Sequence, residues 1–156
     1  MGQHTDVYVN VRRWKSYMYC RCLTKQEFIV NTKHTLHLLS SGFIESDVDN
    51  ILHHVSEYDT SIVFLMNDIH KYPEISDACI IIPEIIKYFS GKSFCKLFMN
   101  IENSEYLADK YKIIKYPSVL FFKRDTFTGY VSGIYPWKEY KEKILFHLNL
   151  IPCVGG

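Results

Sequence analysis

The side chains with the greatest chemical potential in this sequence are its five cysteines, Cys20, Cys22, Cys79, Cys95 and Cys153. Thiols support disulfide bonds, metal binding and thiol–disulfide exchange. Their spacing matches no zinc site and no disulfide framework, and Cys20-x-Cys22 is too short for a redox C-x-x-C pair. Scattered thiols in odd number are typical of a reducing cytosol, so we expect a cytoplasmic protein without metal or other cofactor.

Cys79 is the cysteine whose position most resembles that of a reactive thiol. It lies at the start of a helix predicted over 79–89, where the helix dipole can lower the pKa of a thiol. A single thiol can form a mixed disulfide, but no partner thiol is visible to resolve it. We therefore expect a buried, inactive Cys79, and the alternative is a monothiol disulfide oxidoreductase that uses Cys79.

The elements that must position these residues alternate between helices and strands. In the first half we predict helical turns over 35–41, an amphipathic helix over about 46–58 capped by Ser46, a buried strand over 61–66, a loop over 67–77 and the helix over 79–89. In the second half we predict a strand over 96–99, a helix capped by Asn103 or Ser104, a strand over 118–122, a turn over 123–128, a strand over 129–132 and a closing helix with Trp137, Tyr140, Ile144 and Leu148 buried. This order indicates an α/β fold.

The stretch from Lys96 to Lys123 organises the chain. Its pattern Leu107-Ala108-x-x-Tyr111-x-Ile113-x-x-Tyr116-Pro117-Ser118-x-x-x-Phe122 resembles the second half of a thioredoxin fold, in which the proline is cis and lies beside the active-site loop. The resemblance implies a thioredoxin-like three-layer α/β sandwich, with a central mixed β-sheet flanked by helices. It also implies a cis bond before Pro117, which is possible because X-Pro is the class of peptide bond whose cis form is energetically accessible.

The redox dithiol of thioredoxins is missing from this sequence. Pro83 is similar to the proline that interrupts the redox helix of that fold, and the family spacing then places the two thiols at Ile75 and Ala78. Neither position is a cysteine. Because disulfide reduction needs a second thiol to resolve the mixed disulfide, we expect a protein that is not an enzyme.

Two further motifs resemble a narrower family, the hydrogenase-expression proteins of the HyaE/HoxO type, which are thioredoxin-like and lack the dithiol. These motifs are Pro73-Glu74-Ile75-Ser76-Asp77 and Gly133-Ile-Tyr-Pro-Trp137-x-Glu139. The resemblance implies a non-catalytic chaperone for the assembly of a membrane-bound nickel–iron hydrogenase. Its partner would be the small-subunit precursor, bound through the twin-arginine signal peptide.

The candidate partner-binding residues surround the loop that replaces the dithiol, and they are Glu74, Asp77, Tyr116, Pro117, Tyr135 and Trp137. Glu74 and Asp77 offer carboxylates to arginine forks, although complementing the N-terminus of a helix is an equal explanation for them. Tyr116 and Pro117 would form a wall where the main chain can pair with an extended peptide. Trp137 is also explained by core packing.

The formal charge of +1 gives no global field for nucleic acid or a membrane, and no apolar run is long enough to span a bilayer. Residues 34–84 carry one Lys and nine Asp/Glu, which could attract the basic segment of a signal peptide or simply form a solvated face. A structural adaptor that pairs through a sheet edge is a third hypothesis.

The domain boundaries follow from pattern and composition. We predict a weakly ordered N-terminal extension over 1–33, a thioredoxin-like domain over 34–150 and a C-terminal tail over 151–156. Arg12-Arg13 in the extension invites comparison with an export signal, but no uninterrupted apolar segment follows it, so we do not expect export.

Overall fold

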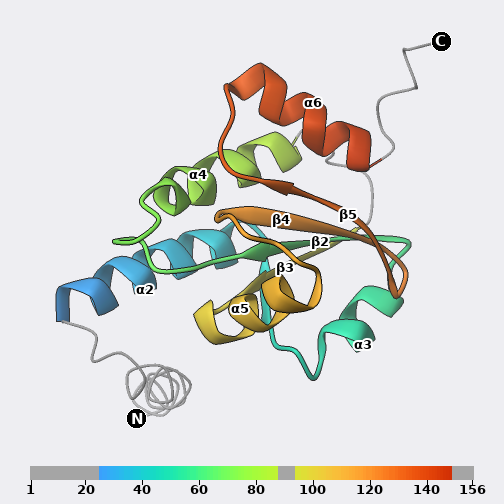
Figure 1. The fold of residues 1–156 in the computed structure, drawn as a ribbon, viewed down its shortest axis with the longest axis horizontal. Coiled ribbons are helices and arrows are strands. Elements are labelled where there is room, and N and C mark those ends of the chain that lie inside the picture. Colours follow the sequence, from blue (N-terminus) through green and yellow to red (C-terminus); the bar gives the residue numbers. More distant parts are fainter. Residues whose placement is uncertain (1–24, 88–93, 149–156) are drawn as a thin grey trace. The chain divides into compact units, whose positions relative to one another are not determined.

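A computed structural model describes residues 25–87 and 94–148, and the side chains from residue 33 onward (Figure 1). The chain divides into two compact units, residues 1–33 and 34–156. The described elements are α2 (Lys25–Ser40), β1 (Ile44–Ser46), α3 (Ile51–Ser56), β2 (Thr60–Leu65), α4 (Glu74–Ile86), β3 (Cys95–Met99), α5 (Ile101–Lys110), β4 (Ser118–Lys123), β5 (Thr126–Ser132) and α6 (Trp137–His147).

The second unit is built on a five-stranded sheet in the order β1-β3-β2-β4-β5. Strands β1, β3 and β2 are parallel, whereas β4 runs antiparallel to β2 and β5 antiparallel to β4. The predicted α/β fold with a central mixed sheet flanked by helices is therefore confirmed.

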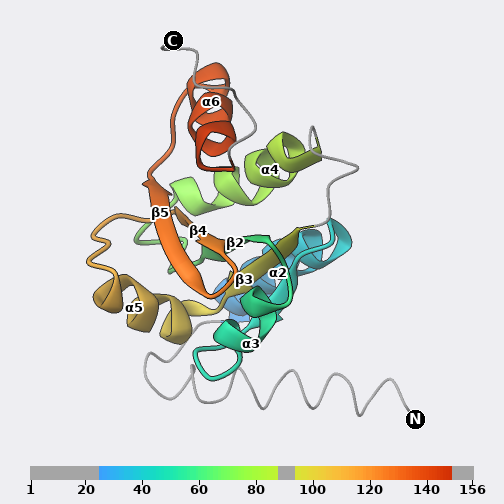
Figure 2. The ribbon, with the colours of Figure 1, turned by 90° about the vertical axis from the view of Figure 1, so that its right-hand side faces the viewer.

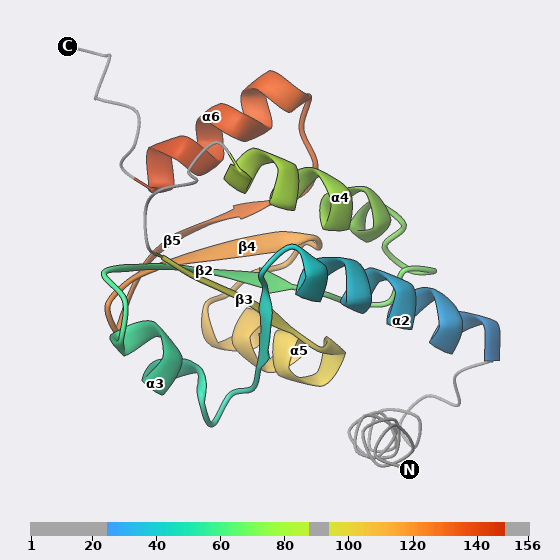
Figure 3. The same cartoon turned by 180° about the vertical axis from the view of Figure 1, so that it is seen from behind.

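Helices cover both faces of this sheet. Strand β2 is buried on both sides, because Ile62 and Phe64 contribute to one apolar cluster and Val63 and Leu65 to the other. Helices α4 and α6 pack on the first face, and α3 and α5 on the second (Figure 2 and Figure 3). The apolar run in the sequence of this strand is continuous because the strand lies between two helical layers and is covered on both faces.

Helix α4 begins at Glu74, earlier than the predicted start at Cys79. Pro73 precedes it with φ −62°, a value already suited to a helix, and Ile75 and Ala78 extend the buried stripe toward the N-terminus. Pro83 lies inside the helix and is buried, as the thioredoxin resemblance implied. The predicted helix end at Phe89 lies outside the described residues.

The region between α2 and β2 differs most from the sequence prediction. Strand β1 was not predicted, and the helix expected over about 46–58 is limited to Ile51–Ser56. Ser46 ends β1 instead of capping a helix, and its hydroxyl lies 2.8 Å from Nδ1 of His54. The Asp47 carboxylate accepts the main-chain N–H of Asn50, a local turn that delays the helix.

Helix α5 has a different cap from the one predicted. The Asn100 side chain accepts the N–H of Asn103 at 2.9 Å, so the cap is neither Asn103 nor Ser104. Ser104 is buried inside the first turn, where its hydroxyl donates to the carbonyl of Met99. The cap precedes the expected one because β3 runs directly into the helix.

The last hairpin and helix are close to the predictions. Strand β5 begins at Thr126, so the turn is shorter than the one predicted over 123–128. Helix α2 begins at Lys25, well before the helical turns predicted over 35–41. Tyr140, Ile144 and Leu148 are buried as predicted, whereas Trp137, the first residue of α6, is 44% exposed. The prediction of a buried Trp137 is wrong because helical spacing does not show where the packed part of a helix begins.

Parts of the domain prediction remain untested. Residues 1–24 of the predicted extension and the tail over 151–156 lie outside the described residues, and the bounds 34–150 stay a prediction. None of the described helices has both the length and the apolar character needed to cross a bilayer.

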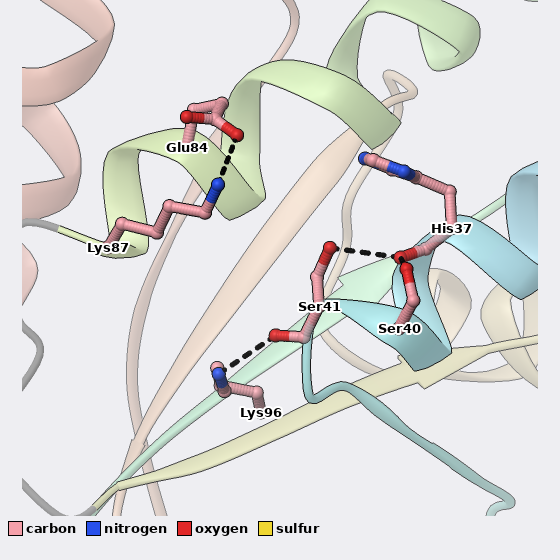
Figure 4. Close-up of polar contacts among 6 residues, drawn as sticks. All are labelled: His37, Ser40, Ser41, Glu84, Lys87 and Lys96. Atoms are coloured by element: carbon pink, nitrogen blue, oxygen red, sulfur yellow. Dashed lines mark hydrogen bonds and ion pairs between the residues drawn. The ribbon is translucent and has the colours of Figure 1, made fainter.

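Gly42 joins α2 to β1 and offers a first test of this packing. Its φ is +90°, and a Cβ there would lie 2.7 Å from Nζ of Lys96, which donates to the Ser41 carbonyl (Figure 4). Gly42→Ala should therefore lower the free energy of unfolding by about 1–3 kcal/mol in urea titration. Gly133→Ala is the matched control, because Gly133 has φ +84° but no atom within 4 Å, so its loss should be smaller. Equal losses of stability in the two variants would contradict the expectation that a side chain at position 42 displaces Lys96.

Candidate functional site

The candidate site is a cavity of about 460 Å³ at one end of the sheet. Three connecting segments form it, namely the turn before α4, the residues before β4 and the link between β5 and α6 (Figure 1). They are remote in sequence, and the sheet order brings them together because β2, β4 and β5 are neighbours.

The cavity unites three of the predicted site residues. Glu74, Tyr116 and Tyr135 all line it. Asp77 lies on the next turn of α4 from Glu74 and is exposed, so it adjoins the cavity without lining it. Trp137 does not line the cavity, and Pro117 is buried directly beside Tyr116.

Tyr116 forms the inner wall of the cavity. Its ring packs on that of Tyr72 at a centroid distance of 5.1 Å. Burial raises the pKa of Tyr116, and the negative charges of Glu105 and ionised Tyr72 act in the same direction, while a hydrogen bond with Asn67 opposes them. The phenol therefore remains neutral at physiological pH and gives the cavity a polar wall.

The main chain beside this wall offers hydrogen-bonding groups. The Tyr116–Pro117 bond is cis, which confirms that expectation. The Pro117 carbonyl accepts the N–H of Gly133 at 2.7 Å, whereas no main-chain hydrogen bond within residues 25–87 and 94–148 involves Tyr116. An extended peptide in the cavity could pair with the main-chain N–H and carbonyl of Tyr116, as an added strand pairs with the edge of a sheet.

The two cysteines that the structure describes, Cys79 and Cys95, lack the features of a redox site, and Cys20, Cys22 and Cys153 lie outside the described residues. Ile75 and Ala78, the positions of the missing thiols, are both buried. Cys79 is buried as predicted, and burial raises its pKa from 9.0 to about 12, so the effect of the helix dipole is outweighed. Cys95 is buried in β3, and burial, with the charge of Glu57, raises its pKa to about 11.

A metal site is not evident in the described part of the chain. No group of three or more His, Cys, Asp and Glu side chains there is arranged to hold a metal ion. Among the described residues, the cavity lining includes a single carboxylate, Glu74, and no thiol or imidazole. The lining offers tyrosines, main-chain groups and charges of both signs, the positive ones on Lys71 and Lys115.

Sequence reasoning missed several residues that shape the cavity. Tyr72 and Asn67 support Tyr116, Glu105 contributes charge from α5, and Lys115 and Ile114 form the outer rim. Of these residues, only Tyr72 could have been recognised from the sequence, because it directly precedes the motif that begins at Pro73 and Glu74. The others are recognisable only after β4 is placed between β2 and β5.

The acidic segment over 34–84 does not form a single face. Asp59, next to α3, and Glu84, on α4, lie on elements that cover opposite faces of the sheet. Each is also paired within the chain, Asp59 with Arg124 at 2.6 Å and Glu84 with Lys87 at 2.6 Å (Figure 4 shows the second pair). The net charge of −8 therefore overstates the negative potential at any one place.

Comparison with known proteins places the chain in a family. The model of the family described as "Hydrogenase-1 expression protein HyaE" matches residues 34–140. The chain belongs to the HyaE family. Hydrogenase expression/formation protein HoxO of Azotobacter vinelandii is 26% identical to this HyaE family member over 103 residues, which are 66% of this chain and 68% of HoxO. Protein HupG of Rhizobium leguminosarum bv. viciae, also named for hydrogenase expression/formation, is 27% identical over 101 residues, 64% of this chain and 67% of HupG.

Solved structures show that this HyaE family protein has a thioredoxin-like fold. A mutant thioredoxin from Halobacterium salinarum NRC-1 aligns with a TM-score of 0.50 at 14% identity, over 70% of this chain and 93% of the thioredoxin. A second solved chain comes from structural work on the thiol-resolving mechanism in yeast mitochondrial 1-Cys peroxiredoxin. It aligns with a TM-score of 0.53 at 10% identity, over 64% of this chain and 92% of that chain. At these identities the likeness concerns the fold alone.

Proposed function

We propose that this HyaE family protein acts in hydrogenase expression as a non-catalytic chaperone that binds the small-subunit precursor of a membrane-bound nickel–iron hydrogenase. The precursor would be held in the cytoplasm through its twin-arginine signal peptide. Membership of the family supports the role in hydrogenase expression. The geometry of the cavity supports the role of a peptide-binding protein.

The observation that carries the proposal is the placement of two carboxylates beside unpaired main-chain groups. Glu74 lines the cavity, and Asp77 follows one turn later on the exposed side of α4. Carboxylates bind arginine through paired, charge-assisted hydrogen bonds, and Tyr116 offers its N–H and carbonyl to the same peptide. Both carboxylates lie in the first turn of α4, where they complement the helix N-terminus, and both are exposed to solvent and so accessible to a ligand.

The monothiol oxidoreductase is less compatible with the structure. Its nucleophile would be Cys79, which has no exposed surface and a pKa raised to about 12. A thiol must be accessible and largely ionised to attack a disulfide at neutral pH. A structural adaptor that pairs through β1 or β5, the two edge strands, would leave Glu74 and Asp77 uninvolved, so one experiment distinguishes it from the chaperone.

The test is calorimetric titration of the full chain with a peptide that carries the basic, two-arginine segment of the hydrogenase small subunit. Because Glu74 and Asp77 are exposed, each ion pair contributes at most about 1 kcal/mol, so the double variant Glu74→Gln/Asp77→Asn should bind about tenfold more weakly. Binding to the wild type should also weaken as salt is raised.

The matched control is Asp49→Asn/Asp109→Asn, which removes two exposed carboxylates elsewhere and should bind as the wild type does. A second peptide, with both arginines replaced by glutamine, should bind no better to the wild type than to the Glu74→Gln/Asp77→Asn variant. Equal affinity of the wild type for the arginine and glutamine peptides would refute the proposed recognition.

A further inference from the structure

The cavity continues along α6 as a second hollow of about 430 Å³. The two share Ile114, Lys115, Ser132 and Tyr135, so they form one groove with two ends. The first end lies at Glu74. The second end, called here the α6 groove, is lined by Ile114, Lys115, Tyr130, Tyr135, Lys143 and His147, together with Val131 and Ser132.

The two ends of the groove differ in the charged residues that line them, because the first end combines Glu74 with Lys71 and Lys115. Glu74 is the only carboxylate that lines either hollow within the described residues, and it belongs to the first end. Lys115 and Lys143 line the α6 groove without a carboxylate in the lining. Glu139 lies 3.8 Å from Nζ of Lys143, but this pair is exposed on one helix and weakly bound. The α6 groove is therefore cationic.

Apolar surface accompanies this positive charge. Ile114 is 87% exposed at the rim shared by both hollows, and Tyr130 is 41% exposed on β5. Tyr135 lies beneath the ammonium group of Lys143 at 4.6 Å from the ring centroid. A ligand that covers Ile114 and Tyr130 would remove apolar surface from water while its charges meet the two lysines.

We propose that the α6 groove binds an apolar, carboxylate-bearing segment of the partner polypeptide, separate from the arginine-bearing segment at Glu74 and Asp77. Lys143, which lines only the α6 groove, disfavours an arginine segment there by like charge, whereas Asp or Glu side chains can pair with both Lys143 and Lys115. This inference rests on the proposed peptide-binding function, but it does not depend on which protein supplies the peptide.

A peptide is favoured over a free anion as the occupant for two reasons. Ile114 and Tyr130 offer apolar contacts that phosphate or a nucleic acid backbone cannot use. Tyr116 lines the first hollow and directly follows Ile114 and Lys115, which line both, so its main-chain groups can pair with an extended chain that continues into the α6 groove. Recognition would thus combine a carboxylate, Glu74, at the first end with the two lysines of the α6 groove and with apolar contact at Ile114 and Tyr130.

The experiment uses three fluorescent peptides with one shared Leu- and Val-rich sequence that carry two Glu, two Gln or two Lys residues. Fluorescence anisotropy with the full chain should show the Glu peptide binding about tenfold more tightly than the Lys peptide, with the Gln peptide between them. Lys115→Glu/Lys143→Glu should weaken the Glu peptide by about tenfold and reverse the order of the series.

The matched control is Lys123→Glu/Lys138→Glu, which makes the same charge change at exposed positions outside the groove and should preserve the order. Lys115→Gln/Lys143→Gln provides a second variant should the charge reversals fail to fold. Equal binding of the Glu and Gln peptides, or displacement of the Glu peptide by inorganic phosphate at millimolar levels, would overturn the proposal.

The outcome is distinguishable from failure of the proposed function. Lys143→Glu alone should leave the two-arginine peptide bound as in the wild type, because Lys143 does not line the hollow at Glu74. If the arginine peptide fails to bind while the Glu peptide obeys the predicted order, the α6 groove stands and the twin-arginine assignment falls. If the arginine peptide binds but the Glu peptide does not obey the predicted order, only the proposal for the α6 groove is refuted.

Discussion

Replacing Tyr140 with alanine should lower the free energy of unfolding by about 3–5 kcal/mol, which is the usual loss when a large aromatic ring is deleted from a core. Tyr140 has no exposed surface, and its ring packs between α4 and α6 with Tyr135 at a centroid distance of 6.0 Å. A small domain has only about 5–15 kcal/mol of net stability, so this single change is a large fraction of it. Urea titration followed by circular dichroism measures the loss.

Replacing the same residue with phenylalanine should have almost no destabilising effect. The hydroxyl of Tyr140 is buried and has no hydrogen-bond partner among the described residues. Removing a buried group that makes no hydrogen bond relieves its desolvation, so Tyr140→Phe should be neutral or more stable by about 1 kcal/mol. A loss above about 1 kcal/mol would mean that the hydroxyl is in fact bonded.

An exposed tyrosine supplies the control for this pair of variants. Tyr106 is 58% exposed on α5. Tyr106→Ala should change the free energy of unfolding by about 0.5 kcal/mol or less, as is usual for surface positions. A loss comparable to that of Tyr140→Ala would contradict the assigned burial of both residues.

The second large effect is a loss of stability at alkaline pH that depends on Cys79. The pKa of Cys79 is about 12 in the folded chain against an ordinary value of 9.0. Between these values the folded state keeps the proton and the unfolded state releases it. Stability is therefore complete below pH 9 and falls as pH rises toward 12, by about 1.4 kcal/mol per unit and about 4 kcal/mol in total.

Variants separate this contribution from those of other groups. Cys79→Ala should flatten the decline, even if the smaller side chain lowers the stability at neutral pH. Cys95 has a pKa of about 11, so Cys95→Ala should flatten only the part of the decline below that pH. An unchanged slope in Cys79→Ala would show that the thiol does not hold its proton as the burial requires.

The same property bears on the alternative of thiol chemistry. In the folded protein at pH 8, iodoacetamide should modify Cys79 at least about a hundredfold more slowly than in urea, because the thiolate is both rare and inaccessible. Peptide mass spectrometry resolves Cys79 from the other cysteines. Rapid modification below pH 7 would instead support the monothiol oxidoreductase.

Some features could be predicted from the sequence because they depend on local composition. The apolar runs over 61–66 and 118–122 became β2 and β4, since an uninterrupted apolar run fits a strand covered on both faces. The stripe of Tyr140, Ile144 and Leu148 became the buried face of α6. The order of the predicted elements indicated the α/β class, whereas the resemblance to known families supplied the cis bond before Pro117 and the thioredoxin-like form of that fold.

Other features depended on partners distant in sequence. Strand β1 has three residues and exists because Ile44 and Ser46 pair with Leu97 and Met99 of β3, a register that no local pattern records. Trp137 has the spacing of a buried residue but lies at the exposed start of α6. In each case the neighbouring element, which is set by the sheet order, decided the outcome.

The candidate site divides in the same way. The sequence by itself determined that the dithiol positions hold Ile75 and Ala78 and that Glu74 and Asp77 precede the stripe of α4. Only the tertiary structure decided that Glu74, Tyr116 and Tyr135 line one cavity and that Lys115 and Lys143 give its continuation a positive charge. The physical reason is that electrostatic interaction depends on distance in space, whereas a charge count along the chain averages residues that folding places on opposite faces of the sheet.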